Sequence, residues 1–389
     1  MTQLATNIYK ALRQVLPSED DTPLHEPSFS GNEWSYVKEC LDTGWVSSVG
    51  KYVNRFEHDL AEYVGVKHAV ATVNGTAALH ICLKLVDVKP NDEVLLPAIT
   101  FIATANAICY CKAIPHFVDC AEDTLGLCPR KLEKYLNEVT EIQSGQCINQ
   151  GTNRRIKAVV PMHTFGHPVD LDPLAEVCEK YHLDLIEDAA ESLGSFTGGV
   201  HTGRTGRMGV LSFNGNKIIT ASCGGMLVAR DVALVDRVRK WSMHSREEDP
   251  QGINNYVHSE LGYNYRMSNV LAGIARGQLE ILEERVEQRR AVFERYRTAF
   301  LDLPGITPQP EIKSGRHTRW LSCFLIDEVL KRAIHRKVRP YKYNIHKTYD
   351  LGKYGYYLEH LNIIIGMYKE ITGSDRHKEL NKRISQHLV

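Results

Sequence analysis

Short apolar segments alternate with helical patterns between about residues 65 and 230, and this alternation limits the possible folds more than any other feature. Strands that alternate with helices predict a largely parallel, doubly wound sheet. Such a sheet binds ligands beyond the carboxyl ends of its strands. The predicted strands cover residues 68–73, 92–97, 113–119, 157–163, 183–188, 209–213 and 224–229.

Fewer elements are predicted elsewhere. Residues 1–30 are polar and turn-rich. Within the alternating region, residues 137–155 are polar, so we expect a surface loop there. One long helix is expected over residues 269–300, because it contains no proline and its apolar stripe suits packing. We therefore expect an N-terminal segment, a large domain over 31–250 and a smaller C-terminal domain over 251–389.

Lys217 stands between a short polar segment and a β-branched run, within residues 212–220. Lysine is rarely buried without a partner or a role. In a closed pocket its amine can lose its charge and form a Schiff base with a carbonyl, and one use of that chemistry is to hold pyridoxal phosphate. The alternative is a surface lysine in a loop, since the chain has 47 Lys and Arg residues.

Residues 74–80 turn from a predicted strand directly into a helix. The free N–H groups and the dipole of a helix N-terminus favour a phosphate. The turn contains one glycine, Gly75, and so matches neither the Rossmann nor the P-loop pattern. It is either an anion site or a structural connection, and a dinucleotide-dependent oxidoreductase is disfavoured.

Phe101 follows one predicted strand and Asp188 ends another, at the edge where ligands bind. Phe101 could stack on a planar ring or lie in the core. Asp188 could pair with a protonated pyridine nitrogen and keep the ring an electron sink, or it could cap a helix. The loop at residues 44–50 is either a plain connector or a lip over the ligand pocket.

Composition excludes several classes of protein. The chain has 47 Lys and Arg against 47 Asp and Glu, which argues against a nucleic-acid partner recruited by bulk charge. No stretch approaches the apolar length of a membrane span, and residues 1–21 do not read as a signal peptide. The ten cysteines include no C-x-x-C pair, so we expect no metal site and a reducing, cytoplasmic location.

Taken together, these segments resemble the DegT/DnrJ/StrS family of pyridoxal-phosphate sugar aminotransferases. The order and spacing of the motifs run from about residue 30 to 325. Residues 212–220 and the 44–50 loop are most similar to the LegC branch, which acts on UDP-linked 4-keto-6-deoxy-2-acetamido sugars. The motifs lie at residues 74–78, 100–107, 163–168, 187–190, 212–225 and 262–267.

The resemblance implies the aspartate-aminotransferase-like fold type I, with a mostly parallel seven-stranded sheet in the large domain and a smaller α+β domain. Lys217 would hold the cofactor and shuttle protons, and Asp188 would pair with the pyridine nitrogen. Phe101 and Ala190 would cover the two faces of the ring. Asn264 would reach the phosphate of the neighbouring subunit, so a homodimer is the expected active unit.

The resemblance also implies the remaining contacts. Thr76, the backbone N–H groups of Thr76 and Ala77, and the Ser212 hydroxyl would hold the phosphate. Glu191 and His163 would line the site. The implied cofactor contacts are Gly75, Thr76, Ala77, Phe101, Asp188, Ala190, Glu191, Ser212, Lys217 and Asn264, and the implied substrate contacts are Trp45, His163, Asn216 and Arg266.

The implied reaction moves an amino group from L-glutamate, through pyridoxal 5′-phosphate, to the 4-keto carbon of a nucleotide-linked 4-keto-6-deoxyhexose. The product would serve the synthesis of cell-surface polysaccharide such as lipopolysaccharide. Lys217 argues against the family's dehydratase branch, in which a histidine replaces the lysine.

The chain departs from the family pattern after about residue 327. Residues 328–389 hold 13 Lys and Arg against 6 Asp and Glu. Of the family's R-P-x-W segment, only Arg339-Pro340 is matched there. The charge is either a solvated helical surface or a surface that favours an anionic nucleotide sugar. A regulatory or inactive relative that binds the cofactor is therefore the alternative function.

Overall fold

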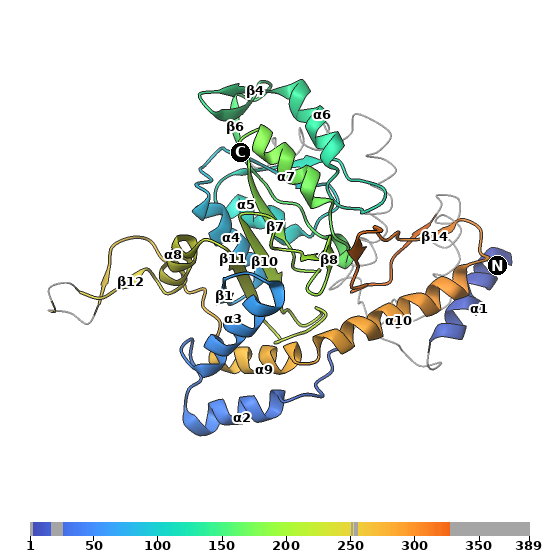
Figure 1. Cartoon of the computed structure of the whole chain (residues 1–389), viewed down its shortest axis with the longest axis horizontal. Coiled ribbons are helices and arrows are strands. Elements are labelled where there is room, and N and C mark those ends of the chain that lie inside the picture. The colour runs from blue at the N-terminus through green and yellow to red at the C-terminus, as the bar shows by residue number, and fades with distance from the viewer. Residues whose placement is uncertain (1–2, 17–25, 250–251, 253–255, 327–389) are drawn as a thin grey trace.

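The computed structural model describes residues 3–16, 26–249, 252 and 256–326 of the chain. A central sheet with helices on both faces forms its main body (Figure 1). The atypical region at residues 328–389 lies outside the described residues. No helix in the described part of the chain is long and apolar enough to cross a membrane.

The central sheet is mixed and mostly parallel. Its main strands are β1 (His68–Thr72), β2 (Glu93–Pro97), β3 (Ile114–Val118), β6 (Arg154–Val159), β7 (Asp184–Asp188), β10 (Met208–Ser212) and β11 (Gly225–Ala229). Their order is β1-β11-β10-β7-β6-β2-β3. β11 is antiparallel to both its neighbours, whereas the strands from β10 to β3 are parallel. The predicted α/β fold with a mostly parallel sheet is confirmed.

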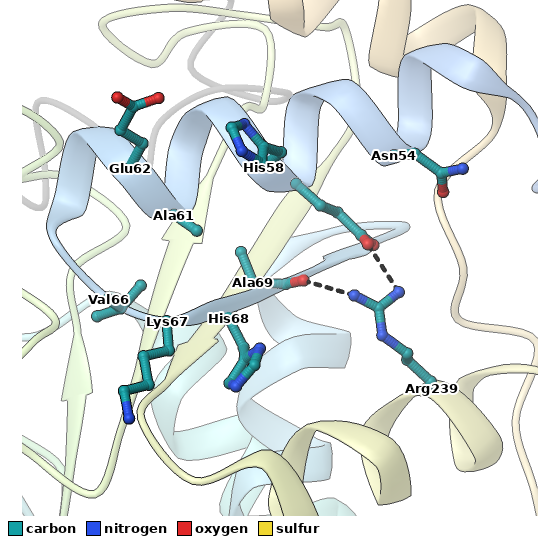
Figure 2. Close-up of a pocket in the computed structure, with 10 residues that line it drawn as sticks. Asn54, His58, Ala61, Glu62, Val66, Lys67, His68, Ala69 and Arg239 are labelled. Carbon is teal, nitrogen blue, oxygen red and sulfur yellow. Dashed lines mark hydrogen bonds and ion pairs between the residues drawn. The ribbon is translucent and has the colours of Figure 1, made fainter.

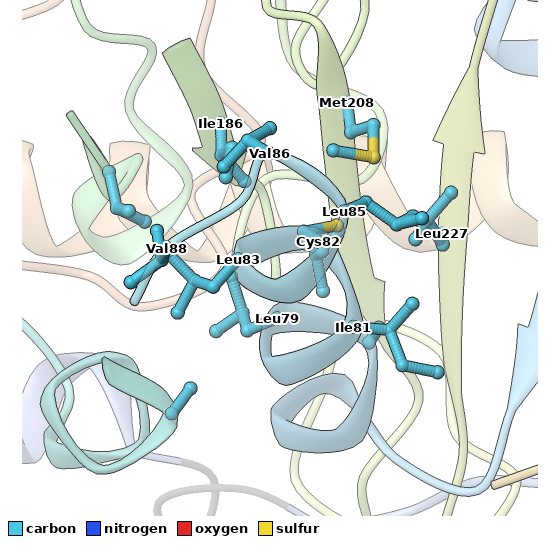
Figure 3. Packing of buried hydrophobic residues seen from close by; sticks show 14 of the residues in the cluster. Leu79, Ile81, Cys82, Leu83, Leu85, Val86, Val88, Ile186, Met208 and Leu227 are labelled. Atoms are coloured by element: carbon cyan, nitrogen blue, oxygen red, sulfur yellow. The ribbon is translucent and has the colours of Figure 1, made fainter. Parts of the chain in front are cut away.

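Helices cover both faces of the sheet because successive strand residues point to opposite faces. Ile186, Met208 and Leu227 pack under α4 on one face, as Figure 3 shows. Leu211 and Met226 pack on the other face, under α3 and α9. The covering helices are α4 (Gly75–Leu85), α5 (Ile102–Tyr110) and α8 (Val232–Ser242) on the first face, and α3 (Lys51–Val64), α9 (Asn269–Leu279), α6 (Pro129–Val139) and α7 (Leu171–Lys180) on the second.

Two predictions for loops and termini were wrong. The expected loop at 137–155 contains a hairpin, β4 (Thr140–Gln143) and β5 (Gln146–Asn149), which joins β6 and brings the sheet to nine strands. Most of β4 is exposed, so it lacks the apolar alternation that marks a strand. The turn-rich N-terminal segment contains α1 (Gln3–Val15), which contacts α10 (Leu282–Phe300).

The long helix expected over 269–300 is two helices, α9 and α10, separated by a turn at residues 280–281. At the turn, the Glu280 carboxylate accepts hydrogen bonds from Tyr36 Oη at 2.6 Å and Asn32 Nδ2 at 2.8 Å. Tyr36 lies on α2 (Glu33–Thr43), so contacts with a distant helix hold the break. A local apolar pattern contains no sign of those contacts.

Short elements complete the described chain. A small sheet joins Phe196 to Arg316, and a second joins Ile306 to Ile326. The elements are η1 (Thr164–Gly166), β8 (Phe196–Thr197), β9 (Val200–His201), β12 (Arg246–Glu247), β13 (Val257–His258), β14 (Ile306–Pro308), β15 (Gly315–Arg316) and β16 (Phe324–Ile326).

Candidate active site

Lys217 lies in the connection between β10 and β11, and its side chain is buried, with 8% of the residue exposed. Its Nζ is 3.5 Å from Glu191 Oε1, 4.3 Å from the ring centroid of Trp320 and 5.9 Å from that of Phe101. This environment excludes the alternative of a surface lysine. The amine instead faces an acid and two aromatic rings.

Two buried acids lie beside this lysine. Asp188 ends β7, and its carboxylate accepts hydrogen bonds from Thr104 Oγ1 at 2.6 Å and Ala190 N at 3.2 Å. Glu191 Oε2 accepts from Phe165 N at 2.8 Å. Burial raises the pKa of both carboxyls, although these bonds and the positive Lys217 oppose the shift. Within the described residues, no cationic side chain forms an ion pair with Asp188.

The N-terminus of α4 abuts the end of β10. A Cβ at Gly75 would lie 3.3 Å from the Cβ of Ser212, so glycine brings the two elements together. Asn74 caps the helix by accepting from Ala77 N at 2.8 Å. The Ala77 N–H expected to bind phosphate is therefore engaged by the cap, while Gly75 and Thr76 occupy the first turn, where N–H groups lack intrahelical partners.

Phe101 immediately precedes α5 and is 40% exposed, so it is not a core residue. Its backbone N–H lies 3.2 Å from Met162 Sδ. Ala190 is half-buried next to Asp188 in sequence. Both residues stand at the carboxyl edge of the sheet, near the acid that a ring nitrogen would need.

Two of the predicted substrate contacts point into the protein. His163 is fully buried; its Nδ1 accepts from Val169 N at 3.1 Å, so its Nε2–H donates to Glu187 Oε2 at 3.0 Å. Arg266 has a 7% exposed side chain and donates through Nη1 to Glu57 Oε1 at 2.5 Å. Both side chains hold other parts of the chain in place.

The other predicted contacts lie nearer the surface. Trp45 is 58% exposed, and its carbonyl accepts from Asn269 Nδ2 at 2.7 Å. Asn216 is half-buried, accepts from Asn214 Nδ2 at 3.2 Å and uses its carbonyl to bind Trp320. Asn264 is exposed on the chain surface. Their roles toward a ligand stay predictions.

Two further residues of this site were not predicted from the sequence. Thr104 binds Asp188 from α5, and the only sequence signal is its position in the first turn of the helix that follows Phe101. Trp320 is 2% exposed and donates through Nε1 to Asn216 O at 2.8 Å, across 104 residues of sequence. No local pattern predicts a contact of that range.

The residues fit pyridoxal phosphate. A buried carboxylate is costly without a positive partner, and a pyridinium would supply one to Asp188. The Lys217 amine is close enough to Asp188 for its charge to oppose the rise in the pKa of that carboxyl. The first turn of α4, beside Ser212, offers N–H groups and a helix dipole to a phosphate. A Schiff-base lysine with an Asp partner for the ring nitrogen is the binding pattern of this cofactor, and it defines the class of protein.

The chain belongs to the DegT/DnrJ/EryC1/StrS aminotransferase family, whose sequence profile matches residues 27–357. The match extends past residue 327, where we expected the resemblance to end. The predicted family and its cofactor, pyridoxal phosphate, are confirmed.

Named relatives agree with this assignment. The chain is 43% identical over 307 residues to EpsN of Bacillus subtilis (strain 168), which carries the assignment of a pyridoxal phosphate-dependent aminotransferase; the match covers 79% of this chain and 76% of EpsN. It is 38% identical to a GDP-perosamine synthase of Caulobacter vibrioides, covering 78% and 77% of the two chains. The crystal structure of the aminotransferase TlmJ from Streptoalloteichus hindustanus superimposes with a TM-score of 0.73 at 29% identity, covering 82% of each chain.

Proposed function

We propose that this chain uses pyridoxal phosphate to move the amino group of L-glutamate to the 4-keto carbon of a UDP-linked 4-keto-6-deoxyhexose. The observation that carries the proposal is the buried Lys217 amine, 3.5 Å from Glu191 Oε1 and bordered by Trp320 and Phe101. The alternative is a relative that binds the cofactor without transferring an amine.

The chain's own residues have separate tasks in this proposal. When bound, the cofactor supplies an electron sink for the carbon that loses or gains a proton. Lys217 Nζ carries that proton, and Glu191 keeps the amine in place. Asp188 provides the negative charge for the ring nitrogen, and Thr104 holds its carboxylate. Trp320 and Phe101 exclude water beside the amine.

The proposed identity of the acceptor is based on the relatives and on the amino-acid sequence of two motifs. A GDP-perosamine synthase is among the relatives, and a structurally similar protein, DesI, was solved with its TDP-sugar product. The choice of a UDP-linked sugar of the LegC type rests on the likeness of residues 212–220 and 44–50 to that branch. The product would enter cell-surface polysaccharide.

The proposed active unit is a cytoplasmic homodimer. Asn264 is exposed in the single chain, although the family pattern gives it a phosphate contact. In a dimer, this side chain would contact the phosphate of the cofactor that the partner subunit binds. Each site would then combine Lys217 of one subunit with Asn264 of the other.

The first test is an absorbance spectrum of the purified protein, recorded before and after addition of L-glutamate. We expect a visible cofactor band that is absent from Lys217→Ala and that moves to shorter wavelength with L-glutamate. A band that never changes would favour the non-catalytic relative. No band in the wild type would overturn the proposal.

The second test compares UDP-, GDP- and TDP-linked 4-keto-6-deoxy sugars as acceptors, with product amines identified by mass spectrometry. We expect the highest kcat/KM with the UDP sugar. A preference for the GDP sugar would keep the aminotransferase and replace its substrate.

A further inference from the structure

Glu57 is a buried acid that the proposed chemistry does not use. It lies on α3 with 5% of the residue exposed. Its Oε1 accepts from Ala71 N at 2.8 Å and from Arg266 Nη1 at 2.5 Å, and its Oε2 pairs with Arg239 Nη1 at 2.7 Å. The carboxylate is therefore held by two guanidinium groups and a backbone N–H.

These partners come from separate parts of the fold. Ala71 lies on the edge strand β1, Arg239 on α8, and Arg266 in the segment of residues 262–267. Arg266 Nη1 also donates to Ala71 O at 3.1 Å, and Arg239 Nη2 donates to Ala69 O at 3.1 Å. Figure 2 shows Arg239 bridging the carboxylate of the α3 helix and the Ala69 carbonyl. Glu57 thus joins α3, β1, α8 and the 262–267 segment.

The 262–267 segment is held on both sides by backbone hydrogen bonds. Tyr265 O accepts from Val73 N at 2.8 Å, and Tyr263 N donates to Trp241 O at 2.7 Å. Asn264 pairs with Met243 in an isolated antiparallel bridge while remaining exposed. Backbone bonds alone do not select the register of such a segment, because every residue carries the same donor and acceptor.

Packing favours one register, since Met267 is fully buried. Arg266 adds a charged restraint on that register. A slip of one residue would place Tyr265 or Met267 beside Glu57 and leave a buried carboxylate without one of its guanidinium partners. Removing one partner of a buried ion pair is strongly unfavourable. The same slip would move Asn264 by one position along the surface.

We propose that Glu57, acting through Arg266 and Arg239, is a positioning residue that fixes the register of residues 262–267 and so directs Asn264 at the cofactor phosphate of the partner subunit. This inference rests on the proposed homodimer with shared sites. Glu57 then supports the site of the partner and not the site that contains its own Lys217.

The test uses hybrid dimers made by co-expressing two differently tagged chains and purifying through both tags. In a hybrid of Glu57→Gln with Lys217→Ala, the only remaining Lys217 belongs to the Glu57→Gln chain, and its site receives Asn264 from a chain with intact Glu57. Pyridoxal phosphate is titrated into the cofactor-free dimer, fixed to Lys217 by borohydride reduction and counted by mass spectrometry.

The expected result is a difference between two kinds of dimer. The Glu57→Gln homodimer should need about tenfold more pyridoxal phosphate for half-maximal labelling. The reason is that misplaced Asn264 side chains no longer donate hydrogen bonds to the charged phosphate of the cofactor. The hybrid should label its Glu57→Gln chain at the wild-type concentration and reach roughly half of the wild-type stoichiometry, since one of its two sites lacks the lysine. A defect confined to the fold of the Glu57→Gln chain cannot give this rescue.

Controls separate this inference from the proposed function. Glu57, Glu62 and Arg239 line one surface pocket (Figure 2). Glu62→Gln makes the same change at an exposed position of α3 in this pocket, and it should label as the wild type does. If Glu57→Gln does not fold, Arg266→Lys replaces it, and the same rescue is expected.

A hybrid of Asn264→Ala with Lys217→Ala tests the shared site itself. If this hybrid regains labelling while the Glu57→Gln hybrid does not, the positioning role is wrong and the shared site stands. If neither hybrid regains labelling, the shared site is wrong, and the role of Glu57 falls with it.

Discussion

Asp188 and Glu93 are both buried acids of the same sheet, but they lie at opposite ends of it. Asp188 is the last residue of β7, and Glu93 is the first residue of the parallel strand β2. Burial raises the pKa of Asp188, whose direct partners are the Thr104 hydroxyl and the Ala190 N–H.

Glu93 has a much fuller set of partners. Its carboxylate accepts from His116 Nδ1 at 2.8 Å, Asn149 Nδ2 at 2.8 Å and Thr152 Oγ1 at 2.7 Å. Burial alone would raise the pKa of Glu93, but these bonds outweigh burial and lower it. A buried acid whose bonds are complete stabilises the fold, whereas one that lacks a cation can accept a positive ligand.

The largest expected effect separates the two acids by activity. Asp188→Asn should lower kcat/KM by about 10²–10³-fold, because a neutral amide cannot match the charge of the ring nitrogen. Glu93→Gln, assayed at saturating pyridoxal phosphate, should retain wild-type activity per folded chain. Steady-state kinetics with L-glutamate and a keto sugar measure both, and equal losses in the two variants would break the comparison.

The free energy of unfolding should distinguish the two acids in the opposite sense, with the larger loss in the Glu93 variant. Glu93→Gln should lower the free energy of unfolding by about 3 kcal/mol at pH 7, because a neutral amide cannot accept all of the buried hydrogen bonds that His116, Asn149 and Thr152 donate to the carboxylate. Because the pKa of Glu93 is lowered by folding, its contribution is present above the unfolded-state value of about 4.3 and is lost as pH falls through the folded-state pKa. The wild type and variant should therefore converge in acid.

Urea unfolding of the cofactor-free protein at several pH values measures this difference. Glu122→Gln makes the same change at an exposed position and should stay close to the wild type. In the cofactor-free protein, Asp188→Asn should not lose stability at pH 7, because it removes a charge that burial disfavours. A loss as large as that of Glu93→Gln would contradict the distinction between the acids.

The sequence was sufficient where short-range rules decide the structure. Strands and helices between residues 65 and 230 followed from apolar periodicity. The position of Asp188 at the end of a strand also followed from the pattern, whereas its role and that of Lys217 stay predictions. The helix start at Gly75 followed from its strand-turn-helix pattern.

The sequence was insufficient where distant contacts decide which partner a side chain takes. Arg266 was predicted to face substrate, but the structure pairs it with Glu57, 209 residues away. Trp320 reaches the Lys217 segment across 104 residues, and Glu280 ends α9 through contacts with α2. Charge and residue type predict that such groups need partners, but the topology selects those partners.

The smallest expected effect concerns the Thr104 hydroxyl, one of the two direct hydrogen-bond donors to Asp188. Thr104→Val keeps the shape of the side chain and removes the 2.6 Å bond to Asp188 Oδ2, so cofactor affinity should fall by roughly tenfold or less. That bond favours the charged carboxylate, so its loss should raise the pKa of Asp188 further. Because the cofactor pairs with the charged form, the rise of affinity with pH should move to higher pH in Thr104→Val, whereas Thr104→Ser should keep the wild-type profile. Titrations of pyridoxal phosphate across pH measure this shift, and a Thr104→Val profile that overlays the wild type would mean that Thr104 does not hold the charge of Asp188.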